Sequence, residues 1–331
     1  MNTGLANVGI IANPAASQDI RRVVTHAPSV SNHEKSNIVR RVLLGIAATT
    51  VETVWYLPDA AGITRSAADR LHLPFALLPL EGAWHGTAAD TIAAAAQLAA
   101  RGAGCVITLG GDGTARAAAK GSRDLPLLAL STGTNNAFPS HLEGTLAGMA
   151  AGSVATVAPL ATRTAPLLEL WRNGVLVDLA LVDVAAVDDT LGGRAVWEIE
   201  RVRQIITTRT IPGTVGLSAI GGHLGIASPA AAIAVAVTIA ATNAPPATPT
   251  LIVSAPIAPG LIVPVPVSDY TWLRDGDTFD LPSGVALALD GERELMTRTG
   301  ETWQVRVVAA GLRVVAVEQA LAAYAQMKNA E

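Results

Sequence analysis

The stretch Leu109-Gly110-Gly111-Asp112-Gly113-Thr114 decides how the first half of this chain folds. It follows an apolar run at 105–109, typical of a buried strand, and precedes residues 115–120, which predict a helix. N–H groups of a glycine turn at a helix N-terminus can point at an anion, and glycine lets a phosphate approach the backbone. An aspartate there would repel phosphate unless Mg²⁺ or a reacting hydroxyl lay between them. Asp112 is therefore the first candidate for chemistry.

The turn does not match the common phosphate-binding fingerprints. No Gly-Lys-Ser/Thr follows it, as a Walker loop requires, and the spacing of Gly110 and Gly113 does not fit the dinucleotide fingerprint. The alternative interpretation is a plain strand-to-helix turn that carries an aspartate. The rest of the chain makes that alternative weaker.

Composition limits the classes of function. The chain has 331 residues, half of them hydrophobic and 15% charged, which is enough for a large core and favours two domains. The net charge of −4 argues against binding to nucleic acid or to an anionic membrane. Cys105 is the single cysteine and lies in an apolar run, and no secretory signal is visible. A cytoplasmic protein is the natural expectation.

Strand and helix patterns alternate about five times before residue 150. This alternation predicts an α/β nucleotide-binding domain with a parallel sheet over residues 1–155. Ligands bind beyond the carboxyl ends of the strands in such sheets. The loops at Asn13, Trp84, Asp112 and Gly133 all lie at that edge by construction, so they can converge on one site.

The pattern changes after about residue 160. Asn173-Gly174 between two apolar runs predicts a hairpin, and residues 197–206 predict a helix. Residues 210–268 contain no Asp, Glu, Lys or Arg and are broken by nine prolines. We expect short buried strands there, in a β-rich, sandwich-like domain over residues 156–312 that also joins copies into a homo-oligomer. A terminal helix in residues 313–331 should return to the first domain.

Two further polar segments could contribute to a site. The loop at residues 131–139 offers small hydroxyls, a glycine and two amides, which suit the phosphates and sugar of a nucleotide. Near the end, Asp290-Gly291-Glu292 follows an apolar strand, and the two carboxylates can face the same side of a hairpin. An ordinary polar turn and a charged hairpin tip are the alternatives for these segments.

Taken in order, Asn13-Pro14, Gly110 to Thr114, Gly133 to Asn136 and Asp290-Gly291-Glu292 resemble the superfamily of NAD kinases and diacylglycerol kinases. The chain is more closely similar, over nearly its whole length, to the ATP-NAD kinase-like proteins of the acetoin catabolism protein X family. The segments that carry this closer resemblance include residues 10–15, 19–22, 132–139, 191–198 and 289–294.

The resemblance implies that ATP is the phosphoryl donor, with Mg²⁺, and that a small molecule is the acceptor. It implies that Asp112, Glu292 and Asp290 are the catalytic carboxylates and that Asp112 and Asp290 hold the metal. The residues implied to bind the nucleotide are Asn13, Gly110, Gly111, Gly113, Thr114, Thr132, Gly133, Thr134, Asn135 and Asn136.

The acceptor site carries over less well than the nucleotide loops. Ala137 stands where lipid kinases have an aspartate, and the segment that holds the dinucleotide in NAD kinases has no clear counterpart. The leading hypothesis is a kinase that phosphorylates a hydroxyl, with NAD as the first candidate acceptor. A lipid kinase and a non-catalytic nucleotide sensor are the alternatives. His85 and His223 are interpreted as structural histidines.

Overall fold

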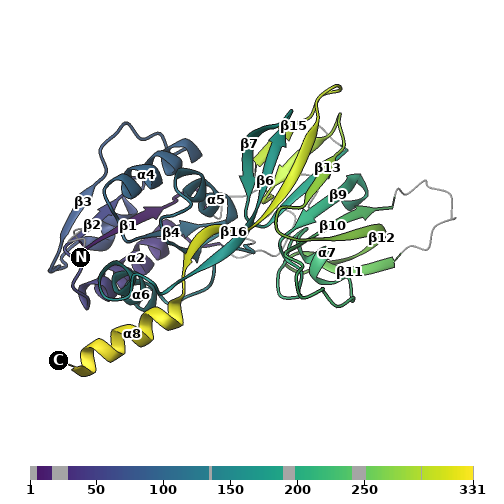
Figure 1. Ribbon diagram of the computed structural model, residues 1–331. Helices are drawn as coiled ribbons and strands as arrows, with labels where there is room; N and C mark the ends of the chain where they lie inside the picture. Colours follow the sequence, from purple (N-terminus) through teal and green to yellow (C-terminus); the bar gives the residue numbers. More distant parts are fainter. Residues whose placement is uncertain are drawn as a thin grey trace.

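The computed structural model describes residues 6–16, 29–133, 136–188, 198–240, 251–291 and 293–330. The described strands form two sheets, and Figure 1 shows the α/β layers of the first half beside the β-rich second half. The expected fold class, an α/β domain with a parallel sheet followed by a β-rich sandwich-like domain, is confirmed.

The first half is a doubly wound parallel sheet. Neighbouring strands run in the order β3-β2-β1-β4-β5, and all four pairings are parallel. The order reverses between β1 and β4, so the switch point of the sheet lies between the carboxyl ends of these two strands. The strands are β1 (Asn7–Ala12), β2 (Thr53–Tyr56), β3 (Ala76–Pro79), β4 (Cys105–Gly110) and β5 (Leu127–Ser131).

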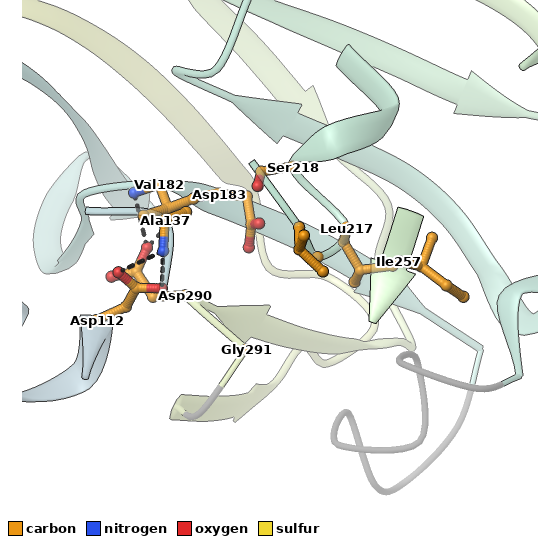
Figure 2. Close-up of a pocket in the computed structure, with 11 residues that line it drawn as sticks. Asp112, Ala137, Val182, Asp183, Leu217, Ser218, Ile257, Asp290 and Gly291 are labelled. Carbon is orange, nitrogen blue, oxygen red and sulfur yellow. Dashed lines mark hydrogen bonds between the residues drawn. The ribbon is translucent and has the colours of Figure 1, made fainter. Parts of the chain in front are cut away.

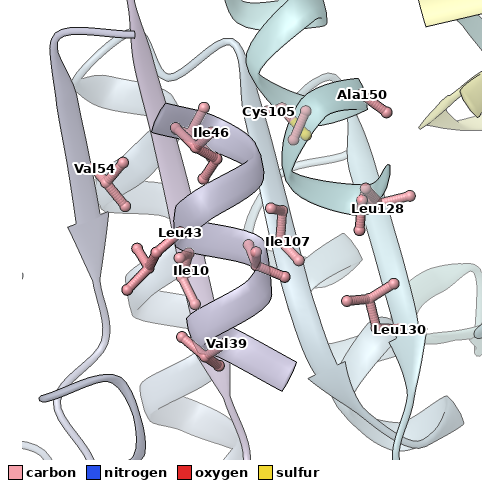
Figure 3. Packing of buried hydrophobic residues seen from close by; sticks show 14 of the residues in the cluster. Ile10, Val39, Leu43, Ile46, Val54, Cys105, Ile107, Leu128, Leu130 and Ala150 are labelled. Carbon is pink, nitrogen blue, oxygen red and sulfur yellow. The ribbon is translucent and has the colours of Figure 1, made fainter. Parts of the chain in front are cut away.

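Helices cover both faces of this sheet. They are α2 (Asn32–Ala47), α3 (Ile63–Ala68), α4 (Ala88–Ala100), α5 (Asp112–Gly121) and α6 (Gly144–Thr156). Figure 3 shows one face, where Leu43 and Ile46 of α2 pack on Ile10 and Ile107 of the sheet. The thiol of Cys105 lies in the same cluster, and burial raises its pKa, so it is an inert core side chain.

Helices α2 and α6 approach each other backbone to backbone. A Cβ built on Gly148 would lie 2.1 Å from the carbonyl oxygen of Val42 and 2.9 Å from the amide nitrogen of Ile46. Neither backbone atom can move without moving the whole of α2. Glycine at this position therefore sets the distance between the two helices.

Gly148→Ala is expected to destabilise the protein by about 1–3 kcal/mol, because the added methyl group forces α2 and α6 apart. The higher helix propensity of alanine alone would stabilise the protein by about 1 kcal/mol. The sign of the change in the free energy of unfolding therefore tells whether the steric clash or the propensity dominates. The free energy of unfolding is measured in urea. Leu146→Ala, on the exposed side of α6, is the control and should change it by much less. A stabilised Gly148→Ala variant would refute the close approach.

The second half is a β-sandwich. Its own sheet runs β11-β12-β10-β9-β8-β14-β15, with every pairing antiparallel. Leu168 and Val305 from the first sheet share a buried cluster with Ile206 and Leu287 from the second. The strands are β6 (Thr162–Arg172), β7 (Val175–Ala180), β8 (Asp183–Val187), β9 (Val202–Thr207), β10 (Ala234–Ile239), β11 (Leu251–Ala258), β12 (Leu261–Leu273), β13 (Thr278–Leu281), β14 (Ala286–Leu289), β15 (Arg293–Met296) and β16 (Trp303–Val315).

Local predictions in the second half fared unevenly. The Asn173-Gly174 hairpin between β6 and β7 is confirmed, with positive φ at both turn residues. The helix expected at residues 197–206 is wrong over its described part, which forms one 3₁₀ turn, η2 (Ile199–Arg201), and then β9. β-branched Ile205 and Ile206 point to opposite faces of the sheet, and both are buried between β8 and β10.

The first sheet continues into the sandwich through two long strands. β16 pairs with β5 at one register position, Val314 opposite Leu127, and then runs antiparallel to β6 along almost its whole length. Helix α8 (Val317–Ala330) follows β16 and packs on α6, where the hydroxyl of Ser153 donates to the carbonyl of Ala320 at 2.9 Å. Figure 1 shows α8 lying under the first half of the chain.

Within the described ranges, no helix is both long enough and apolar enough to cross a bilayer. The edge strand β11 and its neighbour β12 carry the exposed side chains of Ile252 and Ile262. Association of copies through this domain stays a prediction.

Candidate functional site

The loops that follow β1, β4 and β5 meet at the switch point of the parallel sheet. The side-chain amide of Asn13, just after β1, donates to the hydroxyl of Thr114 in the first turn of α5 at 2.9 Å. A Cβ on Gly133, after β5, would lie 3.0 Å from the Cα of Gly111. The amide N–H of Thr132 donates to the carbonyl of Gly110 at 3.0 Å. The glycines are thus needed for the close packing of one loop on another.

A cavity of about 630 Å³ opens beside these loops. This volume lies within the range of pockets that bind cofactors and other small molecules. The cavity lies over the carboxyl ends of β1 and β2 and beside the first turns of α4 and α5. The side chains that shape it include Asn13, Pro14, Asp59, Trp84, His85, Thr87, Asp90, Thr114 and Arg116.

Helix α5 begins at Asp112 itself, three residues earlier than the sequence pattern predicts, with Gly111 as its extended N-cap residue. Gly113 and Thr114 therefore lie in its first turn and line the 630 Å³ cavity. The positive end of the helix dipole faces a cavity wall, which favours an anionic ligand there.

The Asp112 carboxylate holds the loop after β5. Its Oδ1 accepts the amide N–H of Phe138 at 2.7 Å, and its two oxygens accept the amide N–H of Ala137 at 3.2 and 3.0 Å. These bonds fix Ala137 and Phe138 against the start of α5.

The Asp290 carboxylate lies at the connection between β7 and β8, where the chain passes into the second sheet. Its oxygens accept the amide N–H groups of Leu181, Val182 and Asp183 at 2.8–3.2 Å, and the Nε of Arg116 lies 3.4 Å from Oδ2. Burial raises the pKa of Asp290, and the charge of Arg116 and the three N–H groups oppose that rise. With so many donors around it, Asp290 is suited to positioning the connection.

Asp112, Asp183 and Asp290 line one small cavity of about 30 Å³, enough for a water molecule or an ion. Figure 2 shows the side chains of Asp112, Asp183 and Asp290, which come from different parts of the chain. The backbone nitrogens of Ala137 and Val182 lie beside Asp112 and Asp290. The structure therefore brings together two of the three expected catalytic residues. Glu292, Thr134 and Asn135 lie outside the described residues.

Three residues of this region escape sequence reasoning. Asp183 begins an otherwise apolar strand, Arg116 lies inside α5, and Arg209 directly precedes the charge-free stretch. The signal for Asp183 and Arg209 is a single charge at the edge of an apolar run. No local signal marks Arg116, because its partners Asp178 and Asp290 are distant in the sequence.

The donor set fits a magnesium ion. Asp112 and Asp183 present carboxylate oxygens at the small cavity, and Mg²⁺ is usually bound by one or two carboxylates together with phosphates and water. In the described part of the chain, no group of three or more His, Cys, Asp or Glu side chains is arranged as a complete metal site.

Lys35 holds the loop at the other side of the large cavity. Its side chain is fully buried, and Nζ donates to the carbonyls of Pro14 and Ala16 at 3.0 and 2.8 Å and to Oδ1 of Asn32 at 3.2 Å. Burial lowers the pKa of Lys35 to about 8, although the nearby charge of Asp59 opposes this shift. The ammonium group therefore titrates close to neutral pH.

The affinity of the large cavity for an anionic ligand is expected to fall as the pH rises through about 8, because a neutral amine has two N–H donors for three acceptors and the loop at Pro14 loosens. Stability should move the other way. The pKa of Lys35 is lower in the folded chain than its ordinary value of 10.5, so its contribution to the free energy of unfolding rises between about pH 8 and 10.5. Titrations with inorganic triphosphate and urea unfolding across this range measure both trends.

Lys35→Met is the matched variant. It should bind the anionic ligand weakly at every pH, without a midpoint near 8. A wild-type affinity that stayed flat from pH 7 to pH 9.5 would contradict the role given to Lys35.

Comparisons with known proteins divide the chain in the same way as its architecture. Residues 8–151 match the ATP-NAD kinase N-terminal domain, and residues 166–310 match the acetoin catabolism protein X C-terminal domain. A curated relative, acetoin catabolism protein X from Cupriavidus necator, is 37% identical over 305 residues, which cover 87% of this chain and 84% of the relative.

Solved structures show a more distant similarity. Two of them, described as "A putative diacylglycerol kinase from Bacillus anthracis str. Sterne" and "Crystal structure of a putative diacylglycerol kinase from Bacillus anthracis str. Sterne", are each 14% identical and align over 95% of this chain, with TM-scores of 0.44 and 0.42. The alignments cover 99% and 98% of those chains.

Proposed function

This chain belongs to the acetoin catabolism protein X family, and on that premise we propose that it is an ATP-dependent kinase that phosphorylates a hydroxyl group of a small molecule. The observation that carries the proposal is the large cavity at the switch point, which Gly113 and Thr114 line from the first turn of α5, the helix that begins at Asp112. The match of residues 8–151 to an ATP-NAD kinase domain supports ATP as the donor.

In this proposal, the large cavity holds the nucleotide. The triphosphate lies over the N-terminus of α5, where Gly113 and Thr114 present the backbone and the helix dipole favours negative charge. The Asn13 amide fixes the Thr114 hydroxyl, and Arg116 adds a positive charge to the wall. These groups bind and orient the donor.

The transfer step asks little covalent chemistry of the protein. A bond forms between the acceptor oxygen and the terminal phosphorus, and the bond from that phosphorus to the bridging oxygen breaks, releasing ADP. The hydroxyl proton passes to the Asp112 carboxylate. When bound, Mg²⁺ neutralises charge on the phosphates; Asp112 and Asp183 would hold it.

Asp290 is assigned a positioning role. Its carboxylate is fully buried among backbone N–H groups and Arg116, so it fixes Asp183 relative to α5. The two carboxylates expected to hold the metal thus differ in their surroundings, and the contacts favour Asp112 over Asp290 as the residue at the reacting atoms.

NAD is the first acceptor to test, because the donor half of the chain is NAD kinase-like. The experiment is a transfer screen with ATP labelled at the γ-phosphate, using NAD, NADH, polyols, hydroxy acids and a dispersed diacylglycerol as acceptors. Label in a product other than phosphate supports the proposal. Absence of transfer to every acceptor class, together with absence of ATP binding, would overturn it.

A nucleotide sensor without transferase activity is the second candidate. It is favoured by one observation, that the Asp112 oxygens already accept the N–H groups of Ala137 and Phe138. A sensor would bind MgATP tightly and transfer no label in the same screen, so one experiment separates the two candidates.

A further inference from the structure

Besides the large and the small cavity, a further pocket opens where strand β5 separates from strand β16. The two strands pair only at Leu127 and Val314, and beyond that point Ser140 takes the place beside β5. Its N–H donates to the carbonyl of Ala129 at 3.0 Å, and its carbonyl accepts the N–H of Ser131 at 2.9 Å. The wedge left between this segment, β6 and β16 has a volume of about 280 Å³.

Two arginines from different elements line this wedge. Arg163 lies at the start of β6, and Arg209 follows the end of β9 in the second sheet. Glu318, in the first turn of α8, is the acidic residue among the lining side chains. The other lining side chains are apolar except for Ser140, so the described wall carries a net positive charge.

Arg209 is held in a distinctive way. Its guanidinium carbon lies 5.8 Å from the centre of the Phe138 ring, and its buried Nε has no hydrogen-bond partner among the described residues. Burial lowers the pKa of Arg209, and the charges of Asp112, Asp290 and Asp183 oppose that shift. A buried guanidinium N–H without an acceptor is costly, so a ligand that supplies an acceptor would be favoured.

The wedge adjoins the carboxylate cavity. Phe138 lines the wedge, while its own amide N–H donates to Asp112. Ala137, the preceding residue, lines the carboxylate cavity. The Ala137-Phe138 segment therefore separates a molecule anchored beside Arg209 from the carboxylate that would take the hydroxyl proton.

We propose that this wedge binds an anionic group of the phosphoryl acceptor, a carboxylate or a phosphate, through the guanidinium groups of Arg163 and Arg209. The planar fork of arginine matches the oxygens of both groups. The identification of this ligand as the phosphoryl acceptor rests on the proposed kinase function. It limits the acceptor to molecules that carry an anionic group near their hydroxyl.

Three matched probes test the wedge: glycerate, glycerol 3-phosphate and glycerol, which share a three-carbon hydroxyl skeleton. Binding to the full chain is measured by calorimetry with a non-hydrolysable ATP analogue filling the large cavity. At least one of the two anions should bind, while glycerol should not. Arg209→Gln and Arg163→Gln should each weaken that binding at least tenfold, and Arg209→Lys should weaken it less than Arg209→Gln.

Arg203→Gln is the control, because Arg203 lies on β9, is exposed and pairs with Asp188 away from the wedge. It should bind the anions as the wild type does. Binding of the ATP analogue is measured first and should be equal in all variants. If the analogue binds but neither anion does, or if both Gln variants bind the anion as tightly as the wild type, the wedge proposal is overturned. If the analogue itself does not bind, the donor proposal fails instead.

Discussion

Asp112→Asn is expected to lower phosphoryl transfer by about 10²–10⁴-fold, the range that a positioned general base contributes. An asparagine oxygen can still accept the N–H groups of Ala137 and Phe138, so the loop after β5 should keep its position. The amide cannot take the hydroxyl proton at neutral pH. The variant therefore separates the structural role of this side chain from its chemical role.

The measurement is the turnover number with γ-labelled ATP and the acceptor found by the screen, together with the affinity for the ATP analogue. The affinity, measured without Mg²⁺ so that the loss of a metal-binding carboxylate does not enter, should change by less than a few-fold. Asp124→Asn, in the exposed loop after α5, is the control and should keep full activity. Full turnover by Asp112→Asn would show that Asp112 is only a loop clamp.

Arg116→Met is expected to destabilise the fold by about 3–5 kcal/mol, the usual effect of removing one partner from a buried charge network. Arg116 connects α5 to two carboxylates, Asp178 on β7 at 3.4 Å and Asp290 after β14 at 3.4 Å. Asp178 keeps Lys120 at 2.8 Å, but Asp290 loses its counter-charge while fully buried. Methionine fills most of the space of the arginine stem.

Most of the destabilisation caused by Arg116→Met should arise at the Asp290 carboxylate. Because burial already raises the pKa of this carboxyl above its ordinary value of 3.8, stability is lost as the pH rises from that value through the folded pKa, and removal of Arg116 should increase the loss. Asp290→Asn in the Arg116→Met background should therefore recover part of the stability. Arg123→Met breaks the more exposed ion pair with Glu169 and should cost at most about 1 kcal/mol. Urea unfolding that ranks Arg116→Met no worse than Arg123→Met would contradict this picture.

Much of the first half could be predicted from the sequence. The apolar run before Gly110 and the helix pattern after Thr114 fix a strand-turn-helix unit, and repetition of that unit requires a parallel sheet. The convergence of Asn13, Thr114 and Gly133 follows from the same rule, because carboxyl ends of parallel strands share one edge. The Asn173-Gly174 hairpin was predictable because its positive φ values suit those two residues.

The rest depends on contacts between residues distant in the sequence. Strand β9 was expected to be a helix, because burial between β8 and β10 is invisible in its local pattern. The chemical role of Asp290, which only the family resemblance implies, stays a prediction. Its contacts could not be predicted, because its partners at residues 181–183 lie more than 100 positions away in the sequence. Arg163 and Arg209 line the same wedge because β16 and β5 separate after a single paired position. No local sequence pattern predicts that separation.

The central claim is that the cavity at the switch point of the parallel sheet holds the triphosphate, with Asp112 at its reacting end. The most direct measurement is a crystal structure of the chain with Mg²⁺ and a non-hydrolysable ATP analogue. We expect the nucleotide in the 630 Å³ cavity between Asn13 and the first turn of α5, with its terminal phosphate facing Asp112. A nucleotide seated in the wedge beside Arg209, or remote from α5, would contradict the account.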